Sequence, residues 1–94
     1  MALGRQLAAM IERHEKLITD PIIVEYVNRI GQKVASHADV KVPLVVKVIA
    51  SDEPRVETVP GGSVCYLGTE LVQTANSEAE LAGAIAHGIG HVAV

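Results

Sequence analysis

The C-terminal run of this chain, residues 81–94 (LAGAIAHGIGHVAV), constrains its fold more than any other stretch, because only His87 and His91 in it carry polar side chains. On a helix, residues four apart lie one turn apart on the same face. A helix that is apolar on all sides is normally buried, and a buried imidazole needs a hydrogen-bond partner or a metal. Two imidazoles at this spacing can direct ring nitrogens to one point, as in H-E-x-x-H zinc sites. The run therefore predicts a buried helix with two candidate metal ligands.

The spacing fits the H-E-x-x-H motif, but the residue types fit it only in part. In that motif the histidines bind zinc, and the glutamate after the first histidine takes a proton from the zinc-bound water. Gly88 stands at the glutamate position here. A third protein ligand must come from elsewhere, and Glu80 lies about 10 Å from His87 along the helix axis, which is too far to share one zinc. Two ordinary surface histidines are the alternative that the residues alone leave open.

Composition indicates one small domain and argues against several kinds of partner. A chain of 94 residues buries only about 60–65% of its unfolded surface. The only aromatic residues are Tyr26 and Tyr66, so the core must be aliphatic. The net charge is −3 and no Lys/Arg cluster occurs, which argues against a nucleic-acid partner. Cys65 is the only cysteine, which excludes an intrachain disulfide and a structural thiolate zinc site. No apolar run is long enough to span a membrane, and the N-terminus lacks the order of a signal peptide.

Two amphipathic helices are expected in the first part of the chain. Apolar residues recur at helical spacing over residues 3–18, with charged residues between them. Asp20 can cap a second helix that starts at Pro21 and ends near His37. Gly31 inside the second helix costs about 1 kcal/mol relative to alanine, unless a neighbour must approach closely. His14 and His37 are expected on helix surfaces.

The middle of the chain predicts short strands. Residues 44–50, 56–59 and 63–67 are rich in β-branched residues and are separated by turn residues at 51–54 and 60–62. The last two strands, joined by a tight connection, should pair antiparallel. A linker at 40–43 precedes the strands, and a short helix at 69–75 follows them. Ser77 and Glu80 form a capping box that starts the histidine-bearing helix. These elements predict an α+β fold: N-terminal helices, a small antiparallel sheet, and then the histidine-bearing helix packed on it.

Several stretches resemble a known family in the right order along the chain. Residues 76–92 (NSEAELAGAIAHGIGHV) resemble the active-site helix of the HtpX-like and CAAX-prenyl-protease-like zinc metallopeptidases, in particular the periplasmic BepA-like branch with its typical N-E-A-E-L-A-x-V-L-A-H-E-I-G-H. Residues 3–6 (LGRQ) resemble the opening helix of that family, and residues 20–31, from Asp20-Pro21 through YVNRIG, resemble its next helix. The PGG at 60–62, with Val64, Tyr66 and Gly68 after it, resembles the strand–turn–strand before its active-site helix.

This resemblance implies a zincin-like domain that hydrolyses peptide bonds with a zinc-activated water. It implies that His87 and His91 are metal ligands for zinc and that a polypeptide is the substrate. Residues 1–94 would then be a single domain, the N-terminal part of a metallopeptidase domain that continues beyond the helix carrying the two histidines. The resemblance also suggests the bacterial periplasm or cell envelope, whereas the residues themselves say nothing about the compartment.

Three departures from the family pattern lead us to expect an inactive chain. Gly88 replaces the catalytic glutamate, and loss of a general base typically costs about 10²–10⁴-fold in rate. The chain ends at Val94, whereas the third zinc ligand of the family, a glutamate, lies on a later helix, so zinc is expected to bind weakly or not at all. Residues 55–59 (RVETV) lack the Asn-Ala-Phe usually found before the Pro-Gly-Gly turn.

Two other functions fit the same residues. A non-catalytic peptide- or protein-binding module could hold an extended peptide along an exposed sheet edge without any metal. The strand of Val64, Cys65, Tyr66 and Leu67 is the candidate edge and substrate-binding segment. A purely structural fragment is the other possibility, since a short domain offers little to cover an apolar last helix. Whichever function holds, the apolar last helix leads us to expect a homo-oligomer, or aggregation on concentration.

Overall fold

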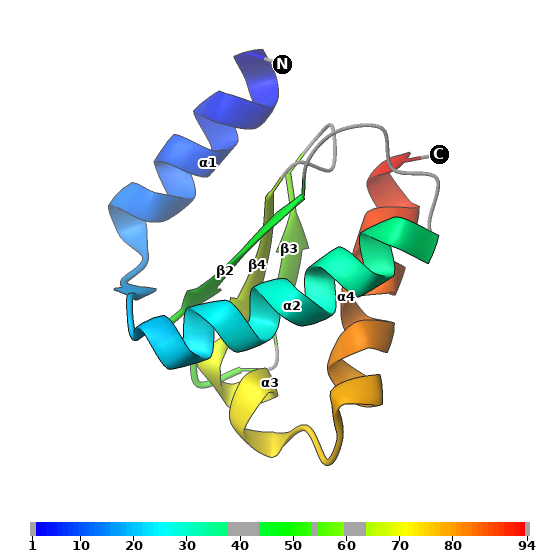
Figure 1. Ribbon diagram of the computed structural model, residues 1–94. Coiled ribbons are helices and arrows are strands. Elements are labelled where there is room, and N and C mark those ends of the chain that lie inside the picture. The colour runs from blue at the N-terminus through cyan, green and yellow to red at the C-terminus, as the bar shows by residue number, and fades with distance from the viewer. Residues whose placement is uncertain (1, 38–43, 54, 60–63, 94) are drawn as a thin grey trace.

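The chain forms four helices and four strands in the ranges that the structure describes. The computed structural model describes the backbone of residues 2–37, 44–53, 55–59 and 64–93, and the side chains of the same ranges apart from 2–4 and 89–93. The elements are α1 (Ala2–His14), β1 (Leu17–Ile18), α2 (Pro21–His37), β2 (Val45–Ile49), β3 (Val56–Thr58), β4 (Val64–Gly68), α3 (Thr69–Thr74) and α4 (Glu78–Ala93) (Figure 1). Helices combined with a four-stranded sheet confirm the α+β class. Among the described residues, no helix has both the length and the hydropathy needed to cross a membrane.

The sheet is mixed, with the strand order β1-β2-β4-β3. β3 pairs antiparallel with β4, as predicted, and β1 pairs antiparallel with β2. β2 and β4 run parallel, which the expected antiparallel sheet did not include. Parallel strands need a crossover of a dozen or more residues. The connection over residues 50–63 has that length, and β3 lies within it on the far side of β4. The predicted linker at 40–43 and tight turn at 60–62 lie outside the described residues.

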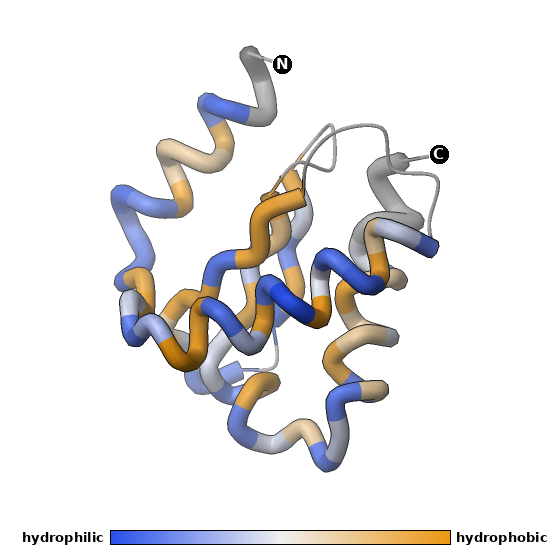
Figure 2. The backbone as a smooth tube through the Cα atoms, in the orientation of Figure 1, coloured by the Kyte–Doolittle hydropathy of each residue, from blue (hydrophilic) through white to orange (hydrophobic). Residues whose placement is uncertain are grey.

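The sheet separates two apolar layers, because successive strand residues point to opposite faces. Val46 and Val48 of β2, with Cys65 and Leu67 of β4, face α2 and α4. On the other face, Tyr66 and Ile49 pack with residues of α1, namely Leu7, Ala8 and Ile11. Figure 1 shows α1 across the sheet from α2 and α4, and Figure 2 shows hydrophobic residues concentrated on the strands between them. The helix that carries the histidines is therefore supported by the sheet and by α2.

The first helix is shorter than the pattern of apolar residues predicts. It ends at His14 rather than at residue 18, and Leu17 and Ile18 form β1 opposite Ile49 and Val48. The backbone carbonyl of Lys16 accepts a hydrogen bond from Ala50 N–H at 2.8 Å. Pairing with β2 satisfies these backbone groups in place of a further helical turn. Helical spacing of Leu17 and Ile18 with the earlier apolar residues could not distinguish the two outcomes.

The second helix follows its predicted bounds and lies very close to the sheet at Gly31. The Asp20 carboxylate accepts a hydrogen bond from Ile22 N–H at 3.0 Å, which confirms the predicted cap. A Cβ atom at Gly31 would lie 2.5 Å from Val46 Cγ2, so the glycine is explained by the close approach of a neighbour. His37 at the end of the helix is exposed, as is His14 at the end of α1, and both agree with the surface positions predicted for them.

The Asn28 side chain of α2 hydrogen-bonds the backbone of β2 on the side away from β4. Asn28 Oδ1 accepts a hydrogen bond from Val46 N–H at 2.8 Å, and Asn28 Nδ2 donates to the Val46 carbonyl at 2.8 Å. The same amide nitrogen donates to Val24 O at 2.9 Å. β1 pairs only with the other end of β2, at Val48 and Ile49. The Asn28 amide thus takes the place of a neighbouring strand at Val46.

Candidate functional site

The start of α4 is fixed by the predicted capping residues. Ser77 Oγ accepts a hydrogen bond from Glu80 N–H at 3.3 Å, which confirms Ser77 as the cap. The Glu80 carboxylate accepts from Asn76 N–H at 2.5 Å, one residue earlier than the Ser77 N–H of the usual box. Glu80 is therefore engaged in capping, at the opposite end of the helix from the histidines. The helix then continues to Ala93, so the backbone of His87 and His91 is helical and the two residues lie one turn apart.

Only one side of α4 is buried in the described residues. Leu81 and Ile85 are 1% and 0% exposed and pack into the core against α2 and the sheet. Gly83, Ala86 and His87 are exposed. The expectation of a helix buried on all sides therefore differs from the structure. The imidazole of His87 is carried away from the core rather than into it, which is the side from which a ligand could reach it.

The two histidines are the metal-ligand candidates, and the described side chains do not add a third. His91 belongs to the helical backbone, but its side chain lies outside the described set. Among the described residues, no group of three or more His, Cys, Asp or Glu side chains is placed to hold a metal ion. The donor set that the helix offers is thus two imidazoles at an i, i+4 spacing, which suits zinc as part of a larger ligand set.

The base position is occupied by a tight contact between α4 and β3. A Cβ atom added at Gly88 would lie 2.6 Å from Thr58 Oγ1 and 3.1 Å from Val56 Cγ1. Observed Cβ atoms essentially never approach another heavy atom to 2.6 Å. The glycine next to His87 therefore lets the helix lie directly against β3. Chemically, no side chain at this position can take a proton from a bound water.

The predicted edge strand is wrong, and the edge lies one strand further out. β4, which contains residues 64–67, is paired with β2 on one side and with β3 on the other. Cys65, Tyr66 and Leu67 are also fully buried, so this strand cannot take up a peptide. The sequence misled because an apolar strand reads the same whether it is central or at an edge. Among the described residues, the strand beside α4 with an open side is β3.

The backbone of β3 presents alternate residues to that open side. Val59 N–H donates to Val64 O at 3.1 Å, and Gly68 N–H donates to Arg55 O at 2.9 Å. In an antiparallel pair the N–H and C=O of one residue point the same way and alternate along the strand. Residues 55, 57 and 59 therefore face β4, whereas Val56 and Thr58 direct their backbone groups away from it. Two residues of β3 can pair with an added extended segment.

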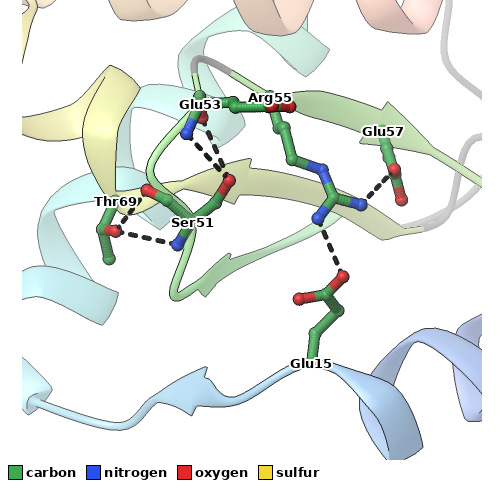
Figure 3. Close-up of polar contacts among 6 residues, drawn as sticks. All are labelled: Glu15, Ser51, Glu53, Arg55, Glu57 and Thr69. Atoms are coloured by element: carbon green, nitrogen blue, oxygen red, sulfur yellow. Dashed lines mark hydrogen bonds and ion pairs between the residues drawn. The ribbon is translucent and has the colours of Figure 1, made fainter.

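Polar contacts fix both β3 and the turn before it (Figure 3). The Arg55 guanidinium contacts Glu15 at 2.8 Å, beyond the end of α1, and also contacts the Glu57 carboxylate. Both contacts raise the pKa of Arg55 above its ordinary value. In the turn, Thr69 Oγ1 accepts from Ser51 N–H at 3.1 Å and donates to Ser51 O at 3.0 Å. These contacts connect the start of β3 to α1 and the start of α3 to the turn.

The Cys65 thiol and the Tyr66 phenol of β4 are buried ionisable groups with raised pKa values. Burial raises the pKa of the Cys65 thiol, and the Thr58 hydroxyl that hydrogen-bonds its sulfur acts in the opposite sense. Tyr66 OH donates to Glu12 Oε2 at 2.6 Å on the α1 side of the sheet. Burial, followed by this hydrogen bond, raises the pKa of the Tyr66 phenol. The raised pKa values favour the neutral forms of both groups, and both side chains are fully buried.

A helix with histidines four residues apart, packed on a small mixed sheet beside an open edge strand, is the framework of a metallopeptidase-like domain. Comparison with protein families agrees, and the chain belongs to peptidase family M48, whose model matches residues 22–94. The beta-barrel assembly-enhancing protease of Escherichia coli (strain K12) is 33% identical over 93 residues, which cover 98% of this chain and 19% of that protein.

Other relatives give the same picture. The putative beta-barrel assembly-enhancing protease of Vibrio cholerae is 37% identical over 90 residues, 95% of this chain and 18% of that protein. The beta-barrel assembly-enhancing protease of Yersinia pestis is 30% identical over 93 residues. The chain thus spans about a fifth of the length of the curated relatives it matches. The resemblance read from the sequence is confirmed at the level of the family.

Proposed function

We propose that this chain retains the framework of a zinc metalloendopeptidase but does not hydrolyse peptides. One observation carries the proposal: the position next to His87 that would hold the base is a glycine in contact with β3. Zinc, when bound, would be held by His87 and His91 and would activate a water for attack on a peptide carbonyl. Position 88, where a carboxylate would accept the proton of that water, carries no side chain. The chain is in this sense a pseudoenzyme.

Zinc binding is expected to be weak, because two imidazoles leave half of a tetrahedral site to other ligands. Calorimetry with zinc should give a Kd of about 1 µM or weaker. The matched variants are His87→Ala and His91→Ala, with His14→Ala as a control for an exposed histidine away from the helix. Loss of zinc binding in the first two and not in the third supports the site. Nanomolar binding that survives both changes would place the metal elsewhere.

Catalysis is tested by cleavage of casein with added zinc and with a chelator. No chelator-sensitive cleavage is expected from the chain. Cleavage that a chelator stops, and that disappears in His87→Ala, would refute the missing-base argument. Gly88→Glu alone should not create activity, because a third zinc ligand is still needed. Gly88→Glu in a longer protein that includes the next ligand-bearing helix should gain it, provided that a smaller residue at position 58 makes room for the new side chain.

A second function, peptide binding without catalysis, is favoured by the open edge of β3. An extended segment can add to such an edge through backbone hydrogen bonds, with no metal required. Binding of fluorescein-labelled casein, followed by anisotropy, tests it directly. Val56→Pro removes an outward N–H and should weaken binding, since proline is tolerated on an edge strand. Glu57→Pro is the matched control: it removes an N–H directed at β4 and should unfold the sheet instead. Equal casein binding by the folded Val56→Pro variant would exclude this edge.

The proposed partner is accordingly a polypeptide, and a nucleic-acid partner is not proposed. The relatives are named for enhancing beta-barrel assembly. We extend to this chain only the expectation that it acts on, or binds, a protein segment in the bacterial cell envelope. Fractionation of the source cells would test the compartment.

A further inference from the structure

We infer that Thr58 and Gly88 form a size-matched pair that joins the edge strand to the histidine-bearing helix and excludes any side chain from position 88. The inference concerns packing and is independent of whether the chain binds zinc or peptide. Thr58 is a positioning residue here: through Gly88 it sets the distance between the open edge of β3 and the helix that carries His87.

Comparing Gly83 with Gly88 shows which glycine of α4 is required by its surroundings and which is not. Gly83 lies one turn after the start of the helix, and a Cβ atom there would meet nothing within 4 Å. At Gly88 the added Cβ would lie 2.6 Å from Thr58 Oγ1 and 3.1 Å from Val56 Cγ1. Both glycines carry the same penalty for helix formation. Only at Gly88 does the surrounding structure explain why the penalty is accepted.

The obstruction comes from the strand side chain rather than from its backbone. Thr58 Cβ itself lies 3.9 Å from the added Cβ, which is ordinary van der Waals contact. Removing Oγ1 by Thr58→Ala therefore opens the space, apart from the remaining contact with Val56. Rotation of Thr58 would relieve the contact only by giving up the hydrogen bond from its hydroxyl to Cys65 Sγ, at 3.8 Å. The strand and the helix thus fit each other only with glycine at 88 or with a small residue at 58.

This pairing changes what reactivation of the chain requires. A glutamate at 88 begins with the same Cβ that alanine would add, so it meets the same obstruction. Introducing a glutamate at position 88 without a change at position 58 would push α4 away from β3. The base position is therefore accessible to a carboxylate only together with a smaller residue at Thr58. The base position is therefore blocked by the Thr58 side chain of β3 as well as lacking a side chain of its own on α4.

Thermal unfolding of four alanine variants tests the pair, with circular dichroism as the signal. Gly83→Ala should raise the Tm by about 4–8 °C, the gain expected from helix propensity alone. Gly88→Ala should lower the Tm relative to the unmodified chain. The double variant Gly88→Ala, Thr58→Ala should have a higher Tm than Thr58→Ala alone. Thr58→Val is the matched control, because it keeps both branches of the side chain and should not rescue Gly88→Ala.

The outcomes separate cleanly. A Tm gain for Gly88→Ala equal to that of Gly83→Ala would overturn the inference, and so would an equal loss in the presence and absence of Thr58→Ala. If Thr58→Ala does not fold, Thr58→Ser gives the same test, since its smaller side chain can turn the hydroxyl away without placing a methyl group against α4. Rescue by serine but not by valine supports the pair. None of these results depends on cleavage or zinc, so they stand apart from the test of the proposed function.

Discussion

Asn28→Ala should destabilise the protein more than any other single polar truncation in α2, because it exposes the side of β2 that β1 does not cover. The change removes the donor to Val46 O and the acceptor from Val46 N–H, both at 2.8 Å. Val46 is 1% exposed, so water reaches these backbone groups poorly. A hydrogen bond contributes about 0.5–1.5 kcal/mol, and an unsatisfied buried group costs about 1–3 kcal/mol. Together these give an expected loss of about 2–4 kcal/mol in the free energy of unfolding.

The assay is urea unfolding followed by circular dichroism, with the Tm as a second measurement. A loss of that size lowers the Tm by about 10–25 °C for a domain of this length. Gln32→Ala is the matched control: Gln32 is an exposed α2 residue whose single hydrogen bond, at 2.7 Å, goes to Leu44 O. It should cost about 1 kcal/mol or less.

Asn28→Asp distinguishes hydrogen bonding from side-chain volume. The aspartate keeps an acceptor for Val46 N–H but places a charged oxygen against the carbonyls of Val46 and Val24. At neutral pH its loss should be at least as large as that of alanine, and it should shrink as acid restores a donor to the carboxyl group. If Asn28→Ala costs no more than Gln32→Ala, the amide does not act as a substitute for a strand and the reasoning is wrong.

Three further outcomes are expected. Hydrogen bonds from Lys47 and then Tyr66 lower the pKa of Glu12 below its ordinary 4.5. This carboxylate therefore stabilises the fold above pH 4.5 and loses its contribution as the pH falls through the lowered pKa. In urea titrations, the difference in unfolding free energy between the unmodified chain and Tyr66→Phe should narrow in acid, and a difference that stays constant with pH would contradict this role of Glu12. Cys65 is 0% exposed and its pKa is raised, so Ellman's reagent should label it slowly in buffer and rapidly in urea, whereas equal rates would show an accessible thiol. The exposed side of α4 should drive self-association that Ala86→Glu reduces, as measured by light scattering; a clean monomer at high concentration would count against it.

Structural features that depend on residues close together in the sequence were predictable. The Asp20–Pro21 start of α2 and the Ser77 cap of α4 depend on side chains that act on backbone two or three residues away. The course of α4 through His87 and His91 followed from that cap and the apolar run after it. The pairing of β3 with β4 followed from the short connection between them. The family was also readable, because motifs spread over the chain occur in one order.

What depends on distant residues was not predictable. The parallel pairing of β2 with β4 places β3 at the edge, and nothing local in an apolar strand such as 64–67 distinguishes an edge from a centre. The contact of Gly88 with Thr58 joins segments 30 residues apart in the sequence. Asn28 looked like an ordinary polar residue beside the apolar stripe of α2. Its role requires a strand end that the sequence gives no means of locating.

The strand order has a kinetic consequence. β4 lies between β2 and β3, so β3 is joined to the rest of the sheet only through the later segment, Val64–Gly68. The contact between β3 and α4 joins residues 30 positions apart in the sequence, so we expect it to form late in folding, after the local pairing of β3 with β4. Changes at Thr58 or Gly88 should therefore appear mainly in the rate of unfolding, while changes at Val46 or Leu67 should also slow refolding. We therefore expect the region best placed to meet a ligand to be the last to form in folding and the first to open in unfolding.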